Sequence, residues 1–94
     1  MEKVMMTEEQ VMDKFKNCLL KFDHYYKYTF SFVGYTNDGY KITCRYGGSS
    51  EDIYRYDVSA TAELRFTELD EWNSVEVHNG KNERVFSHYN ECGW

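Results

Sequence analysis

The fold is decided by residues 7–33, TEEQVMDKFKNCLLKFDHYYKYTFSFV, where the spacing of the apolar residues changes once. In the first part, apolar side chains recur at three- and four-residue intervals, which place them on one face of a helix. These residues are Val11, Phe15, Cys18, Leu19 and Phe22. From residue 26 onward, apolar and polar residues alternate, which is the pattern of a half-buried strand. The change near residue 23 therefore predicts one helix followed by strands.

The start of the helix carries a capping box. The Thr7 hydroxyl is placed to accept a hydrogen bond from the backbone of Gln10, whose side chain can reach back to residue 7. Glu8 and Glu9 in the first turn suit the positive end of the helix dipole. Together with the apolar face, these signals predict a helix at about residues 7–22.

The remaining chain shows the alternation that is typical of strands. It predicts strands at about residues 25–35, 40–46, 53–67, 73–78 and 83–87. The long run at 53–67 has no Gly or Pro, and it fits either one bent strand or two strands joined near residues 59–61. A turn is expected at residues 36–39, where Gly39 can take a positive φ. The fold class is therefore α+β: residues 1–94 form a single domain, with an N-terminal helix packed on an antiparallel sheet of four to six strands.

A hairpin is expected at Asn79-Gly80, between the last two predicted strands. A three-residue loop would place Glu76 opposite Arg84, whereas a two-residue loop would place Glu76 opposite Glu83. Like charges directly opposite each other destabilise a sheet, so the longer loop is favoured. Residues 88–94 are expected to form a tail.

Composition excludes several classes of protein. Charged residues make up 29% of the chain, and no apolar run approaches the roughly 20 residues that span a bilayer. The N-terminus lacks a basic segment followed by an apolar one, so no secretory signal is expected. The three cysteines are odd in number and widely spaced, which favours reduced thiols and a cytoplasmic protein.

Motifs for catalysis or metal binding are weak. His88 and Cys92 are four residues apart, and His78 and Cys44 could join them in space. Zinc sites usually show two close pairs of ligands, and only one such pair exists here. We therefore expect no enzyme, no catalytic residue, no metal and no cofactor. A small enzyme or metal site that uses the His and Cys residues of the C-terminal region is the third hypothesis.

The charge is distributed unevenly. Residues 1–50 carry seven bases and six acids, whereas residues 51–94 carry four bases and ten acids, for a net charge of −5 overall. A surface that binds phosphates needs the opposite sign, so direct nucleic-acid binding is not expected. Charge placed in this way bears on the choice of partner rather than on the fold.

The acidic stretch is the main candidate for a binding surface. Eight acids and two bases lie between residues 51 and 76. Carboxylates on alternate residues of a strand repeat at about 6–7 Å, close to twice the phosphate repeat of one DNA strand. Such a surface could occupy a basic groove of a nucleic-acid-handling protein, although a solvated face that only keeps the protein soluble is an equal alternative. The candidate partner-binding residues are Asp57, Glu63, Glu68, Asp70, Glu71 and Glu76.

The alternative hypothesis is a sheet that binds single-stranded nucleic acid. Nine of the 94 residues are Tyr, and exposed tyrosines on a sheet can stack on bases. The candidates are Tyr26, Tyr28, Tyr54 and Tyr56. Their strict alternation with polar residues favours a structural role instead, in which these rings form the face beneath the helix.

In its general profile the chain resembles small phage-encoded inhibitors of host defence, including anti-CRISPR proteins and DNA mimics. The features that carry the resemblance are short length, acidity, abundant Tyr and a single domain without a catalytic motif. No motif of a particular family is matched, so the resemblance assigns no residue a role. It implies a non-catalytic inhibitor in the cytoplasm, the host's cytoplasm if the protein is phage-encoded, that binds a protein partner with a basic groove. The number of copies in the assembly is not implied.

Overall fold

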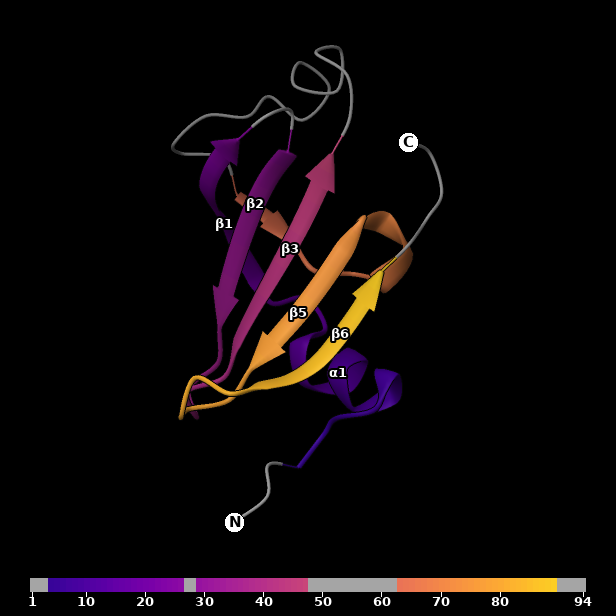
Figure 1. The fold of residues 1–94 in the computed structure, drawn as a ribbon, viewed down its shortest axis with the longest axis vertical. Coiled ribbons are helices and arrows are strands. Elements are labelled where there is room, and N and C mark those ends of the chain that lie inside the picture. Colours follow the sequence, from indigo (N-terminus) through magenta and orange to yellow (C-terminus); the bar gives the residue numbers. More distant parts are fainter. Residues whose placement is uncertain (1–3, 27–28, 48–62, 90–94) are drawn as a thin grey trace.

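The computed structural model describes residues 4–26, 29–47 and 63–89, which form one helix and one antiparallel sheet (Figure 1). The helix is α1 (Glu8–Phe15), and a short 3₁₀ helix, η1, covers Leu69–Glu71. The strands are β1 (Leu19–Tyr26), β2 (Thr29–Tyr35), β3 (Lys41–Gly47), β4 (Glu63–Arg65), β5 (Ser74–His78) and β6 (Arg84–Tyr89). They pair in the order β4-β1-β2-β3-β5-β6. The predicted α+β class is confirmed, and the six strands agree with the predicted four to six.

The predicted capping box is present at the start of α1. The Gln10 backbone N–H donates to the Thr7 hydroxyl at 3.1 Å, and the Thr7 backbone N–H donates to the Gln10 side chain at 2.9 Å. The predicted extent of the helix, residues 7–22, is wrong. The helix ends at Phe15, and residues 19–22 belong to β1.

Asn17 accounts for the early end of the helix. Its φ of 61° lies in the left-handed region, which Asn tolerates better than most residues and which stops a helix. The chain then pairs with a distant segment: the Asn17 N–H donates to the Phe66 carbonyl at 2.8 Å, and the Phe66 N–H donates to the Cys18 carbonyl at 2.9 Å. Leu20 follows, fully buried, with its neighbours more exposed, so the apolar residues after Asn17 follow strand spacing.

The other predicted strands agree in part with the structure. The strands at 40–46 and 73–78 match β3 and β5 within one residue. The strand at 25–35 instead covers the end of β1 and all of β2, which pair with each other. Of the run at 53–67, residues 53–62 lie outside the described residues, and β4 occupies only three positions. The last strand extends to Tyr89, so His88 does not begin a tail.

The predicted register of the last hairpin is also wrong. Glu76 pairs with Ser87, and His78 pairs with Arg84. The Asn79 side-chain oxygen accepts hydrogen bonds from the backbone of Lys81 at 2.9 Å and of Glu83 at 3.0 Å, and so organises a longer loop than Asn-Gly predicts. The positive φ falls on Asn82, at 63°, and not on Gly80.

The buried core lies on one face of the sheet. In Figure 1, β4 lies behind β2 and β3. Phe30, Phe32, Ile42 and Cys44 are buried there, as the alternation predicts. Val11 and Phe15 of α1, Phe66, Leu69 and Trp72 belong to the same buried cluster. Residues of β2, β3, β5 and β6 with the opposite parity form a second face, which we call the outer face.

Removing a ring from this core should destabilise the protein strongly. Phe15 and Phe30 are 0% and 2% exposed, so Phe15→Ala or Phe30→Ala should each cost about 3–5 kcal/mol of unfolding free energy. Urea denaturation followed by circular dichroism measures the change. Met5→Ala, at a residue that is 56% exposed, is the control and should leave the urea midpoint nearly unchanged. An unchanged midpoint for either Phe variant would contradict the described core.

The backbone at Asn17 provides a second test. Asn17→Val places a β-branched residue at a φ of 61° and should cost about 1–2 kcal/mol, whereas Asn17→Gly should be tolerated. The comparison of urea midpoints isolates the backbone, because the Asn17 side chain is exposed in the native protein. Equal stability of the two variants would show that the chain does not turn at this residue.

Candidate binding surface

Three of the predicted binding residues lie in η1 or directly before it. Glu68, Asp70 and Glu71 are exposed, while the intervening Leu69 and the following Trp72 are 7% and 4% exposed. The two apolar side chains anchor the turn in the core and force the carboxylates outward. The Thr67 hydroxyl donates a hydrogen bond to Glu71 at 2.7 Å, which orients that side chain.

A carboxylate from α1 joins this group around His88. Glu8 Oε1 lies 3.5 Å from His88 Nδ1, and Asp70 Oδ1 lies 3.7 Å from His88 Nε2. The imidazole is 22% exposed, whereas the Glu8 and Asp70 side chains are 67% and 80% exposed. We call Glu8, Glu68, Asp70 and Glu71 the acidic patch. The sequence gives no signal that Glu8 belongs to this patch, because a backbone hydrogen bond from Met6 to Val85 brings the start of α1 beside β6.

Glu76 is separated from the acidic patch. It lies on the outer face, where its Oε1 is 3.5 Å from Arg45 Nη1 and 3.9 Å from Arg84 Nη1. The Tyr89 hydroxyl donates to the same oxygen at 3.4 Å. With 15% of its side chain exposed and two cations beside it, Glu76 presents little negative charge to a partner.

Several predicted residues lie outside the described part of the chain. Asp57 is one of them, as are Tyr28, Tyr54 and Tyr56 of the alternative hypothesis. Glu63 and Tyr26 lie in β4 and β1, but only their backbone is described. Whether the acidic side chains of the 53–67 run form a row along one strand therefore stays a prediction.

Within the described residues, two thiols and two histidines can be placed. Cys44 is fully buried, and burial strongly raises the pKa of its thiol, with a further increase from the nearby Cys18. Burial also raises the pKa of Cys18, against an opposing effect of Arg65. His78 projects from the outer face and His88 from the opposite side of the sheet. No three His, Cys, Asp or Glu side chains within residues 4–26, 29–47 and 63–89 are placed to hold a metal ion.

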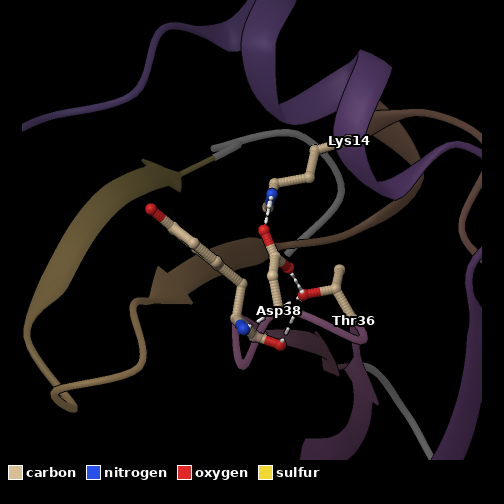
Figure 2. Close-up of polar contacts among 4 residues, drawn as sticks. Lys14, Thr36 and Asp38 are labelled. Atoms are coloured by element: carbon tan, nitrogen blue, oxygen red, sulfur yellow. Dashed lines mark hydrogen bonds and ion pairs between the residues drawn. The ribbon is translucent and has the colours of Figure 1, made fainter.

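A polar contact ties α1 to the turn between β2 and β3 (Figure 2). Lys14 Nζ lies 2.6 Å from Asp38 Oδ2, the Thr36 hydroxyl donates to Asp38 Oδ1, and the Tyr40 N–H donates to the Thr36 hydroxyl at 3.0 Å. The Lys14 ammonium also lies 4.3 Å from the centroid of the Tyr40 ring. The predicted turn at residues 36–39 is confirmed, with Gly39 at a φ of 90°. Its link to the helix has no signal in the local sequence.

Comparisons of the chain with protein-family models, curated proteins and solved structures found no match. Among the described residues, no helix has the length and apolar character that crossing a membrane requires.

The Lys14–Asp38 contact predicts a pH dependence of stability. The hydrogen bond from Lys14, followed by that from Thr36, lowers the pKa of Asp38 below its ordinary value of 3.8. A carboxyl with a lowered folded pKa stabilises the protein above the unfolded pKa, and this contribution is lost as pH falls through the folded pKa. Wild type should therefore have a higher thermal midpoint than Asp38→Asn near neutral pH, and the difference should shrink as pH falls below 3.8 and the carboxyl of the folded protein is protonated.

Lys14→Met provides the control for this measurement. In that background the Asp38→Asn change should have a smaller effect at neutral pH, because the main partner of the carboxylate is gone. A difference in midpoint that is the same at pH 7 and pH 2 would show that Asp38 acts through its shape rather than its charge.

Proposed function

We propose that this protein is a non-catalytic binding protein whose acidic patch docks on a basic surface of a partner protein. The observation that supports it is the approach of Glu8 and Asp70, which lie far apart in the sequence, to the same imidazole of His88. Both carboxylates remain mostly exposed there, so they are available to a partner.

Local structure accounts for Glu8 but not for the whole group of charges. Glu8 has a structural role, because an acid in the first turn of α1 favours the helix dipole. Glu68 stands at the N-cap of η1 but makes no side-chain capping hydrogen bond there. Carboxylates held near one another repel, and this repulsion is relieved when cations of a partner approach. Such an arrangement favours binding over a purely solubilising role.

The acidic patch is also held on an ordered support. Leu69 and Trp72 are buried on both sides of the carboxylates, and the Trp72 ring lies 5.6 Å from the Phe32 ring, measured between centroids. A surface that is already ordered loses less conformational entropy when it binds. We infer that α1 lies across the core face of the sheet, with Val11 and Phe15 beneath it, and so supports Glu8 in the same way.

The partner that best suits these charges is a protein that handles nucleic acid. A groove lined with Lys and Arg for phosphates also accepts carboxylates, and a protein that fills it acts as an inhibitor. This is the mode of the phage-encoded inhibitors and DNA mimics that the chain resembles in composition. The free thiols of Cys18 and Cys44 support a reducing, cytoplasmic environment, and their raised pKa supports a role other than thiol catalysis.

Charge reversal tests the proposal. Glu68→Lys combined with Glu71→Lys should weaken partner binding at least tenfold, or about 1.4 kcal/mol, because both side chains are exposed on the acidic patch. The thermal midpoint should change little, since exposed charges contribute little to folding. Immobilised protein is used to capture the partner from host lysate at low salt, and affinity is then measured by titration with the purified partner.

The matched control is Asp13→Lys combined with Glu83→Lys. It makes the same change in net charge, but Asp13 lines a groove with Tyr40, and Glu83 lies in the loop between β5 and β6. This control should bind nearly as tightly as wild type, and the affinity of wild type should fall as salt rises. If both charge variants bind equally well, or if salt has no effect, the acidic patch is not the docking surface.

A further inference from the structure

The outer face of the sheet carries a second group of charged and aromatic residues. The buried Ile42 and Cys44 fix the orientation of β3, so Lys41 and Arg45 project on the opposite side. Strand pairing aligns Tyr35 with Lys41, and Val33 with Lys21. On β5 and β6 the same face includes Glu76, Arg84 and Tyr89.

The sign of this face is opposite to that of the whole chain. Five cations occupy described positions on this face or along its edge: Lys21, Lys41, Arg45, Arg65 and Arg84. The carboxylates at the described positions of this face are Glu76, Asp23 beside the groove at β1, and Glu63, which pairs with Lys21 and of which only the backbone is described. The face therefore has an excess of two positive charges in a protein of net charge −5. At physiological salt the Debye length is about 8 Å, so charges on the other side of the molecule only weakly offset this potential.

Glu76 orients the two arginines without covering them. The Glu76 side chain is 15% exposed, whereas those of Arg45 and Arg84 are 39% and 55% exposed. One oxygen of Glu76, Oε1, lies near both guanidinium groups, and the Glu76 side chain is more buried than either arginine. Two cations that share one anion retain a net positive charge. This arrangement suits the binding of phosphates, for which guanidinium groups are well shaped.

Exposed tyrosines are interspersed with these cations. Tyr35 and Tyr89 are 68% and 63% exposed, unlike the aromatic rings of the core face. Tyr35 borders a groove, lined also by Leu19, Lys21, Phe22, Asp23, Val33 and Gly34. Tyr35 lies on β2 and Tyr89 on β6, which is the third strand away in the sheet. The strand registers offset the two residues by about four positions along the strands. Strand spacing and rise then place their backbones roughly 19 Å apart. A segment of about four nucleotides is the shortest single-strand site on comparable sheet surfaces.

We propose that the outer face binds single-stranded nucleic acid, with phosphates on Lys21, Lys41, Arg45 and Arg84 and bases stacked on Tyr35 and Tyr89. Acidic peptides would satisfy the cations but would leave the two exposed rings without a role, whereas every nucleobase can stack. From the sequence, single-stranded nucleic-acid binding is only the alternative hypothesis and is placed on other tyrosines, because net charge averages over the chain whereas the fold separates the signs. This site is independent of the acidic patch.

Fluorescence anisotropy with labelled dT12 and rU12 in 50 mM salt tests the proposal. Micromolar binding of either strand is expected, and the tighter of the two identifies DNA or RNA as the better ligand. Tyr35→Ala combined with Tyr89→Ala should weaken binding at least tenfold, because stacking on each ring is lost. An abasic 12-mer should bind wild type as weakly as dT12 binds this variant. Absence of binding to both strands at 100 µM protein would overturn the proposal.

Charge variants separate this site from general attraction to a polyanion. Lys21→Gln combined with Lys41→Gln should weaken binding and lower the slope of log affinity against log salt by about 1.4, since two phosphate contacts are lost. Lys16→Gln combined with Lys81→Gln is the control with the same net charge, and it should bind like wild type. Equal weakening by both pairs would overturn the proposal. Glu68→Lys combined with Glu71→Lys should not weaken binding of either oligonucleotide, because these residues belong to the acidic patch. The nucleic-acid site and the acidic patch can therefore fail their tests separately.

Discussion

The contact on which the rest of the fold depends is the pair of backbone hydrogen bonds between the Asn17–Cys18 turn and Phe66, at 2.8 and 2.9 Å. These bonds join the end of α1 and the start of β1 to a segment that follows much later in the chain. They continue directly into the pairing of Leu19 with Arg65, which adds β4 to the sheet. They also direct the Phe66 ring into the core, where it is fully buried. Leu69 and Trp72 follow within one short turn, and their burial determines where the η1 carboxylates face the solvent. The acidic patch is therefore a consequence of a non-local backbone contact.

Much of the fold could be predicted from local patterns. Thr7 and Gln10 identified the start of the helix because a capping box is made by residues close in the chain. The strands around Ile42 and Val75 were predictable because burial on one face imposes strict alternation. The end of the helix was not, because the apolar residues from Cys18 to Phe22 fit both helical and strand spacing. Asn17 was the available signal, and its left-handed backbone is stabilised by Phe66, which no local pattern identifies.

The candidate surfaces were less predictable for the same reason. Glu68, Asp70 and Glu71 could be identified as an acidic turn, but the addition of Glu8 requires the position of His88 in the folded chain. Glu76 belongs to the same acidic stretch in the sequence, yet strand pairing places it between Arg45 and Arg84. Carboxylates that are close in the sequence were therefore assigned to one surface, although the fold places Glu76 on a different face from Asp70. Net charge had the same weakness, because it combined an acidic patch and a cationic face into one number.

Strand β6 connects the two surfaces. Successive residues of a strand project to opposite sides, so Ser87 and Tyr89 belong to the outer face while His88 lies between Glu8 and Asp70. The bulge at Val85 shifts the parity of this strand, and without that extra residue the face assigned to each later side chain would be reversed. The inserted Val85 therefore determines that His88 lies near Glu8 and Asp70, and that Tyr89 lies on the same face as Arg45 and Arg84. The acidic patch and the cationic face are thus chemically separate surfaces that share one structural determinant.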